Sequence, residues 1–186
     1  MLTQERVLEI FQNSGALLTG HFRLRSGLHS DRFLQTAVVL QYPEYASALC
    51  AEMAARVKVE AVDIVIGPAI GGVILAYEVA KALGARALFG EKSGDQMTLR
   101  PGFKIGPRDR IVVVDDVLTT GGSVFKLIDL SRQYQAQVVA TAFIIDRSAR
   151  PIDFGVPTVS LAKIDIPTYT PDECPMCKEG IPLVEP

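Results

Sequence analysis

Three largely apolar runs constrain the fold of this chain more than any other feature. They span residues 62–66, 111–114 and 138–145, and they are rich in β-branched residues. Helix-like segments, 73–83 and one ending near Tyr134, lie between them. Strands that are apolar on both faces and alternate with helices form a parallel sheet covered on two sides. The sequence therefore predicts an α/β fold with a parallel twisted sheet flanked by helices. Further short strands are expected at 87–89 and 158–161.

The N-terminal part does not follow this strand–helix rhythm. Residues 4–14 have the apolar spacing of an amphipathic helix, and 45–56 have the composition of another. Between them, 20–27 and 32–35 have the pattern of two short strands around a turn. The tail from Ile166 is expected to lie over the surface as a loop, because it is rich in proline. Its prolines are Pro167, Pro171, Pro175, Pro182 and Pro186.

Bulk properties exclude several classes of protein. The 186 residues suit a single domain, and the net charge of −2 gives no general attraction to nucleic acid or to anionic membranes. The first residues lack the pattern of a signal peptide, and no apolar stretch approaches the roughly 18 residues of a membrane span. Three cysteines are too few, and odd in number, for a secreted disulfide framework. We expect a cytoplasmic protein with no nucleic-acid or membrane partner.

The strand at 111–114 leads into the most informative segment of the chain. Two carboxylates, Asp115 and Asp116, follow the strand, and the polar turn 119–123 then opens a helix. Glycines let the backbone approach an anion, and a helix N-terminus favours phosphate. The segment lacks the lysine of a P-loop and the glycine spacing of a dinucleotide fingerprint. Acids beside a monophosphate site indicate a sugar phosphate, with the acids accepting hydrogen bonds from ribose hydroxyls.

This segment resembles the phosphoribosyl pyrophosphate signature of the type I phosphoribosyltransferases. The resemblance implies a parallel sheet with a small N-terminal hood, all in one domain spanning 1–186, with 1–40 and part of the C-terminal tail forming or covering the hood. It also implies a reaction in which a nitrogenous base displaces pyrophosphate from C1 of ribose 5-phosphate, with Mg²⁺ carried by the pyrophosphate. Asp115 and Asp116 would be catalytic. The expected cosubstrate-binding residues are Asp115, Asp116, Val117, Leu118, Thr119, Thr120, Gly121, Gly122 and Ser123.

Two further loops resemble parts of the same family and depart from its pattern. The loop 67–72 resembles the pyrophosphate loop, but Ile70 and Gly71 stand where many orotate enzymes have an aromatic residue and a lysine. A plain strand-to-helix turn is the alternative. The stretch 89–104 corresponds to a mobile catalytic loop, yet it lacks histidine and closely spaced lysines. Lys92 or Arg100 is expected to neutralise pyrophosphate, and an ordinary β-hairpin with solvated charges is the alternative.

The choice of base rests on two other resemblances to orotate phosphoribosyltransferases. Residues 20–30 resemble their hood, with Arg25 where many members have lysine. Asp146-Arg147 resembles a pair whose arginine holds the orotate carboxylate, a group that a guanidinium fits bidentately. Thr119, Arg147 and Arg25 are the expected orotate contacts. The resemblance implies orotate and phosphoribosyl pyrophosphate as substrates and a homodimer.

Two other functions stay open at the level of sequence. A salvage enzyme for a purine or another pyrimidine would share the signature but would have no need of Arg147. A non-catalytic, nucleotide-sensing regulator of the same fold would be expected to bind nucleic acid, against which the acidic balance speaks.

The pair Cys174 and Cys177 has the spacing of metal ligands. A closed zinc site needs four ligands, and Cys50, His21 or His29 could contribute only if the fold brought them near. One C-x-x-C is weak support, so we assign no metal site from the sequence. A reduced pair or a local disulfide is the expectation.

Overall fold

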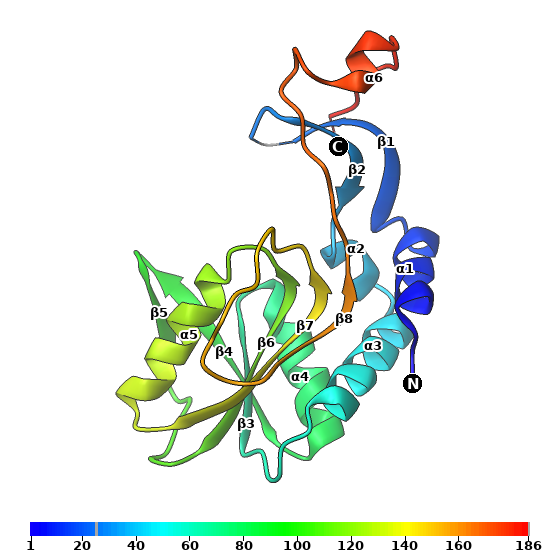
Figure 1. Ribbon diagram of the computed structural model, residues 1–186. Coiled ribbons are helices and arrows are strands. Elements are labelled where there is room, and N and C mark those ends of the chain that lie inside the picture. The colour runs from blue at the N-terminus through cyan, green and yellow to red at the C-terminus, as the bar shows by residue number, and fades with distance from the viewer. Residues whose placement is uncertain (25, 186) are drawn as a thin grey trace.

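A computed structural model describes residues 1–24 and 26–185, and a six-stranded sheet lies at its centre (Figure 1). The strand order is β5-β4-β3-β6-β7-β8. All neighbouring pairs are parallel except β4 and β5. The strands are β3 (Ile64–Pro68), β4 (Arg86–Ser93), β5 (Gln96–Leu99), β6 (Arg110–Leu118), β7 (Gln137–Asp146) and β8 (Thr158–Lys163). The expectation of an α/β fold with a sheet flanked by helices is confirmed.

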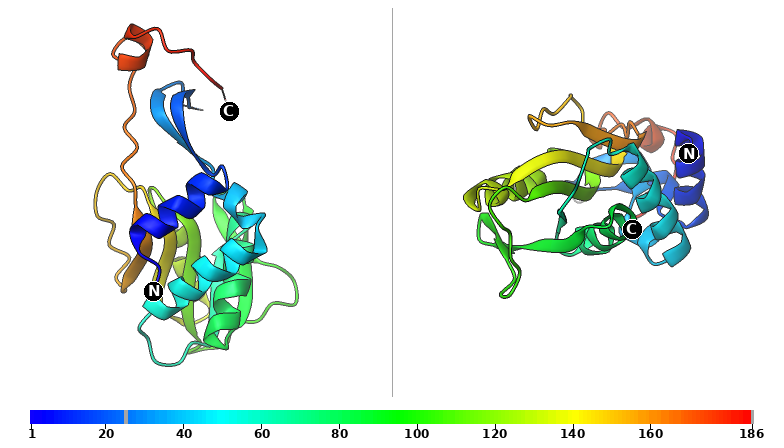
Figure 2. Two further views of the ribbon diagram at one scale, coloured as in Figure 1. Left: turned by 90° about the vertical axis from the view of Figure 1, so that its right-hand side faces the viewer. Right: turned by 90° about the horizontal axis from the view of Figure 1, so that it is seen from below.

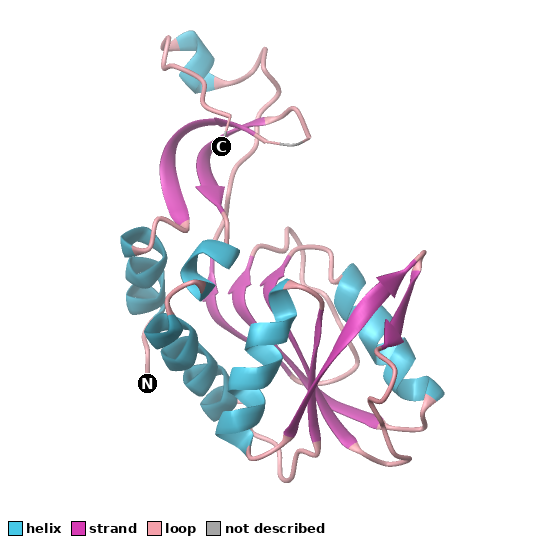
Figure 3. Cartoon of the chain, turned by 180° about the vertical axis from the view of Figure 1, so that it is seen from behind, coloured by secondary structure: helices cyan, strands magenta, loops and turns pink. Residues whose placement is uncertain are grey.

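Helices cover both faces of this sheet (Figures 1 and 3). On one face lie α1 (Gln4–Asn13), α3 (Pro43–Arg56) and α4 (Gly71–Leu83), and on the other lies α5 (Gly122–Gln133). The central strand β6 shows the consequence. Its Val112 and Val114 belong to the core under α3 and α4, whereas Ile111 and Val113 belong to the core under α5. All four are fully buried, which explains why this run is apolar without alternation.

A second, two-stranded sheet forms the hood. It consists of β1 (Leu17–Arg23) and β2 (His29–Leu34), which pair antiparallel, and the short helix α2 (Ala37–Leu40) follows it. Figure 2 shows the hood projecting from the body that contains the sheet. The C-terminal tail runs from β8 up to the hood (Figures 1 and 2). There the amide of His29 donates to Tyr169 O at 2.8 Å, and the amide of Val184 donates to His21 O at 2.8 Å.

Three sequence-based expectations of local structure need correction. The sheet is mixed, because the two-residue connection Gly94-Asp95 turns the chain back and pairs β5 antiparallel with β4. Gly94 has φ 59, which glycine adopts without strain. Strand β6 continues to Leu118, so Asp115 and Asp116 lie in the strand rather than after it. The tail is not wholly loop, since it contains the one-turn helix α6 (Pro175–Lys178).

Within the described residues, no helix combines the length and the apolar character that a membrane crossing would require.

The turn between β3 and α4 gives a test of the packing. Gly67 and Gly72 approach so closely that a Cβ at Gly67 would clash with the Gly72 carbonyl group, whose carbon would lie only 2.8 Å away. We expect Gly67→Ala to lower the free energy of unfolding by about 1–3 kcal/mol, the usual cost of overpacking. Urea denaturation followed by circular dichroism measures the change.

Gly71→Ala in the same turn is the matched control. A Cβ there would meet Asp116 Oδ2 at 3.6 Å, an ordinary contact. Equal losses in the two variants would show that close approach of the backbone is not what requires Gly67.

Candidate active site

The end of β6 and the start of α5 form a small polar hollow of about 80 Å³. Its lining comes from the strand, the turn and the first residues of the helix. The lining residues are Asp115, Val117, Thr119, Thr120, Gly121, Gly122, Ser123, Val124 and Phe143. Amides at the first turn of α5 have no partner inside the helix, and the helix dipole places positive potential at this end. The hollow therefore has the size and the donors for a phosphate group.

Gly121 is required at the N-terminus of α5. It caps the helix with φ 74, a conformation that other residues adopt at a cost. A Cβ at this position would also lie 2.8 Å from the Phe154 ring. Phe154 is buried and stacks on Phe143 with ring centroids 5.9 Å apart. The aromatic packing beneath the turn thus fixes the loop that faces the hollow.

Asp115 lies at the edge of this hollow in an environment that disfavours its charge. Burial, followed by the neighbouring charge of Asp116, raises the pKa of Asp115 to about 7. The amide of Asp116, which donates to Asp115 Oδ1 at 2.9 Å, and the positive charge of Lys92 act in the opposite direction. Asp115 consequently holds a proton below about pH 7 and is ionised above it.

Asp116 faces the other side of the strand, because side chains alternate along β6. Its carboxylate lies near Gly71, where an added Cβ would come within 3.6 Å of Asp116 Oδ2. The loop 67–72 and the phosphate hollow therefore lie on either side of the two acids.

In the loop 67–72, the amide of Ala69 donates to Gly90 O at 2.8 Å, and the Ile70 side chain is 88% exposed. Asp116 and Leu118 do not line the hollow, although both belong to the expected cosubstrate segment.

The β4–β5 hairpin separates the two candidate cations. Arg100 donates to Glu91 across an ion pair of 3.0 Å, and its guanidinium lies 5.7 Å from the centroid of the Phe89 ring. Lys92 is exposed and lies close enough to Asp115 to lower its pKa. The hairpin is thus present, and of its two cations Lys92 is the one whose charge lowers the pKa of Asp115.

Arg147 follows β7 at the same edge of the sheet. The preceding Asp146 is held by the Ser148 hydroxyl at 2.6 Å and by Lys163 at 3.7 Å. Arg147 is half-buried, and burial lowers the pKa of its guanidinium. Among the described residues, its side chain has neither a hydrogen bond nor an ion pair, which leaves all its donors for a ligand.

Arg147 lines a pocket of about 260 Å³ between the sheet and the hood. The pocket's other lining residues are Leu24, Ser26, Arg32, Phe33, Leu34 and Ile166. Arg32 was not identified from the sequence, since only the pairing of β2 with β1 and the path of the tail bring it beside Arg147. Thr119 lines the phosphate hollow instead of this pocket. Arg25 lies outside the described residues.

Comparisons with known proteins show the family to which the chain belongs. A family model described as the phosphoribosyl transferase domain matches residues 43–165. An orotate phosphoribosyltransferase from Caldanaerobacter subterraneus subsp. tengcongensis is 51% identical to the chain, over 100% of the chain and 97% of the relative. One from Pelotomaculum thermopropionicum is 48% identical with the same coverage.

Solved structures extend the similarity to three dimensions. An orotate phosphoribosyltransferase from Aeropyrum pernix has a TM-score of 0.70 and 27% identity, covering 85% of this chain and 93% of its own. An adenine phosphoribosyltransferase from Rhodothermus marinus has a TM-score of 0.68 and 21% identity, covering 86% and 99%, and it shares the fold. The chain belongs to the phosphoribosyl transferase family, in the group whose curated members are orotate phosphoribosyltransferases.

Proposed function

We propose that the protein transfers the ribose 5-phosphate group from 5-phosphoribosyl 1-pyrophosphate to orotate in de novo pyrimidine biosynthesis. The products are orotidine 5′-phosphate and pyrophosphate. The observation that carries the proposal is Arg147, half-buried and without a protein partner among the described residues, in a pocket at the same sheet edge as the phosphate hollow. The names of relatives that match the full length of the chain support orotate as the base.

The phosphate hollow and the pocket that contains Arg147 each bind one of the two substrates. The hollow at the start of α5 holds the 5′-phosphate, and Asp115 accepts hydrogen bonds from the ribose hydroxyls once it is ionised. Arg147 and Arg32 give the neighbouring pocket two guanidiniums for the carboxylate and carbonyl oxygens of orotate. Because both substrates are held at one edge of the sheet, their reacting groups are already oriented, and the bimolecular reaction becomes effectively unimolecular.

Charge on the leaving pyrophosphate must be neutralised for the bond to C1 to break. Lys92 is the side chain that we assign to this role, because Arg100 is already paired with Glu91.

We further propose that Mg²⁺ arrives bound to the cosubstrate and supplies additional positive charge at the pyrophosphate. Asp115 and Asp116 offer the oxygen donors that Mg²⁺ prefers, so the residues at this edge fit the ion.

A salvage phosphoribosyltransferase is the alternative with structural support. The adenine enzyme from Rhodothermus marinus has nearly the same TM-score as the orotate enzyme from Aeropyrum pernix, so the fold alone does not choose the base. The chemistry of the pocket does distinguish them. Two arginines suit an anionic pyrimidine, whereas a neutral purine would leave the half-buried guanidinium of Arg147 without a charged partner. A nucleic-acid-binding regulator would require a basic surface, which the net charge of −2 does not favour.

We also propose a cytoplasmic homodimer. An apolar stripe with helical spacing lies on and just before α4, formed by Ile70, Ile74 and Tyr77, which are 88%, 44% and 63% exposed. Such a patch is typical of a surface that contacts another chain. It lies next to the loop 67–72, so a partner subunit there would be close to the pyrophosphate side of the site.

Removal of the Arg147 guanidinium tests the choice of base. In the presence of Mg²⁺ and saturating cosubstrate, the wild-type protein should deplete orotate, as measured by the fall in its ultraviolet absorbance. Arg147→Ala should lower kcat/KM for orotate about 10-fold or more, because a hydrogen bond to a charged group contributes about 1.5–3 kcal/mol. No change in orotate absorbance with the wild-type protein would rule out the proposed reaction.

Arg150→Ala is the matched control for this experiment. Arg150 is exposed in the same connection after β7, so the substitution removes one positive charge without opening the pocket. Purine use that survives in Arg147→Ala would favour the salvage enzyme.

The assignment of Lys92 is tested in the reverse reaction. Lys92→Ala should raise KM for pyrophosphate about 10–100-fold, since a hydrogen bond to a charged group contributes about 1.5–3 kcal/mol. Arg100→Ala removes the same charge from the same hairpin and should change this KM little. Initial rates of pyrophosphorolysis of orotidine 5′-phosphate measure both effects. A larger effect in Arg100→Ala would reverse the assignment.

The pKa of Asp115 predicts the pH dependence of cosubstrate use. Because the ionised carboxylate is the form that accepts hydrogen bonds, kcat/KM for the cosubstrate should rise as pH increases through about 7. Substrate phosphates also titrate in this range, so a shift of the midpoint between variants is the diagnostic quantity. Lys92→Met should move the midpoint to higher pH, because it removes a charge that lowers the Asp115 pKa. Lys104→Met, an exposed lysine beyond the hairpin, should leave it in place; equal midpoints in all three proteins would contradict the coupling.

A further inference from the structure

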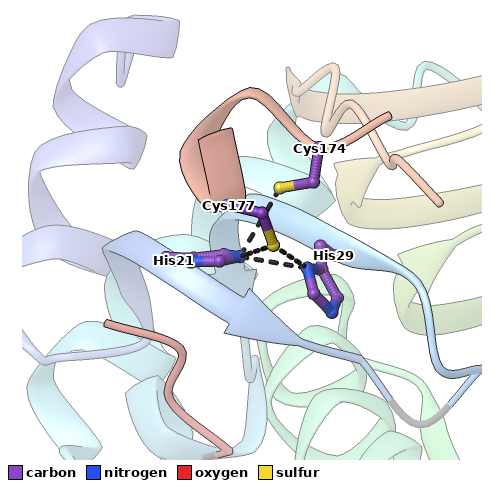
Figure 4. A group of neighbouring side chains, drawn as sticks. All are labelled: His21, His29, Cys174 and Cys177. Carbon is purple, nitrogen blue, oxygen red and sulfur yellow. Dashed lines mark hydrogen bonds between the residues drawn. The ribbon is translucent and has the colours of Figure 1, made fainter. Parts of the chain in front are cut away.

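Four potential metal ligands converge in the hood, away from the active site (Figure 4). His21 comes from β1 and His29 from β2, while in the tail Cys174 caps the N-terminus of α6 and Cys177 lies within that helix. Their nearest nitrogen and sulfur atoms all lie within 4.8 Å of one another. Cys50 is not part of this cluster. It is buried in the core under α3, where burial raises the pKa of its thiol to about 12.

The distances within the cluster match the edges of a small tetrahedron. His21 Nε2 lies 3.0 Å from His29 Nδ1, 3.5 Å from Cys174 Sγ and 3.6 Å from Cys177 Sγ. Cys177 Sγ lies 3.3 Å from His29 Nδ1. Zinc bound tetrahedrally at its usual distances to nitrogen and sulfur would separate its ligand atoms by about 3.3–3.8 Å. An ion at the centre of these four atoms therefore needs little movement of the side chains.

Hydrogen bonding alone accounts poorly for this arrangement. The other ring nitrogen of His21, Nδ1, lies 2.7 Å from the carbonyl oxygen of Ile181, to which it can only donate. In the neutral ring this leaves Nε2 with one lone pair and no proton. Three atoms nevertheless approach Nε2, from His29, Cys174 and Cys177. One lone pair accepts one good hydrogen bond, whereas a central cation would be shared by all four atoms.

The bond from His21 to Ile181 is also what a metal ligand requires. A histidine that binds a metal through one nitrogen usually donates the proton on the other to a carbonyl or carboxylate, which fixes the ring and its tautomer. His21, His29 and Cys174 are buried, which suits a closed site more than an open, catalytic one.

The small size of the hood limits how far its own two strands can stabilise it. It is a two-stranded sheet, and isolated two-stranded sheets are marginally stable in water. The tail contacts it through a few bonds, among them the paired amides of His29 and Tyr169 and the Ser30 hydroxyl on Pro167 O at 2.8 Å. A cross-link between ligands separated by up to 156 residues would close a very long loop, and such closures restrict the unfolded chain strongly.

We propose that His21, His29, Cys174 and Cys177 bind one structural Zn²⁺ ion, which fixes the C-terminal tail to the hood. A tetrahedral set of two nitrogens and two sulfurs suits zinc, which has no preferred geometry of its own and binds both donor types. The inference replaces the sequence-based expectation that the chain has no metal site, and it does not rest on the proposed function. Its consequence for the active site is indirect: β2, the strand that holds His29, also carries Arg32 and Phe33 of the base pocket.

Metal content of the purified full-length chain gives the first test. Protein prepared without chelator should contain about one zinc per chain by inductively coupled plasma mass spectrometry. A C174S/C177S double variant should lose the zinc, and C50A, which removes the third cysteine, should retain it. Zinc that persists in the double variant, or that is lost in C50A, overturns the proposal. So does wild-type protein without stoichiometric metal, or with a Cys174–Cys177 disulfide after purification under reducing conditions.

A second measurement uses only the wild-type chain, because the double variant could fail to fold. Zinc is removed and replaced by Co²⁺, whose visible absorption reports its coordination. Intense bands in the visible region, with a sulfur-to-cobalt charge-transfer band in the near ultraviolet, are expected for two thiolates and two imidazoles in a tetrahedron. Weak bands of octahedral Co²⁺ would overturn the proposal. Removal of zinc should also speed proteolytic cleavage within the tail 166–185, which re-addition of zinc should reverse.

Discussion

Burial of strand β6 on both faces is the constraint on which the rest of the structure depends. Because Val112 and Val114 pack under α3 and α4 while Ile111 and Val113 pack under α5, a shift by one residue would move each of these side chains into the core on the opposite face. Its register therefore fixes where its polar end emerges. Asp115 reaches the hollow at α5 and Asp116 the loop after β3 for the same reason, the alternation of side chains along a strand.

The hood depends on different physics. It has no double-sided core, and the pocket that contains Arg147 is completed by Arg32 of β2 and by Leu24 and Ser26 of the connection between β1 and β2. One side of this pocket is formed by the rigid central sheet and the other by the marginally stable hood. The hood therefore needs a further restraint, since a loosely held side chain orients a substrate poorly. The tail, which pairs with both strands of the hood, provides one restraint. The proposed zinc ion would strengthen this attachment of the tail to the hood.

The sequence predicts the parts of this structure that depend on local pattern. Apolar runs predicted the central strands, and the helix expected over 73–83 ends at Leu83 in the structure, where Gly84 adopts φ 68. The segment 115–123 was recognised because strand, acids and turn are adjacent in the chain. Arg32 was missed, and the His21–Cys177 cluster was left open, because both depend on where the tail lies relative to the hood. No periodicity encodes a contact across about 150 residues.

Charge at the active site shows why a chain with net charge −2 can be suited to polyanionic substrates. The positive groups at this edge are few and local: the N-terminus of α5, Lys92 on the hairpin, and Arg147 with Arg32 beside the hood. Two adjacent carboxylates would oppose them if both were ionised. The raised pKa of Asp115 reduces that opposition, because near pH 7 the carboxyl is protonated for part of the time. A positive charge that approaches Asp115 would lower its pKa again. In the proposed reaction, positive charge develops at C1 of the ribose near these acids. This charge would therefore favour the ionised form of the Asp115 carboxylate in the transition state, where a negative charge is most stabilising.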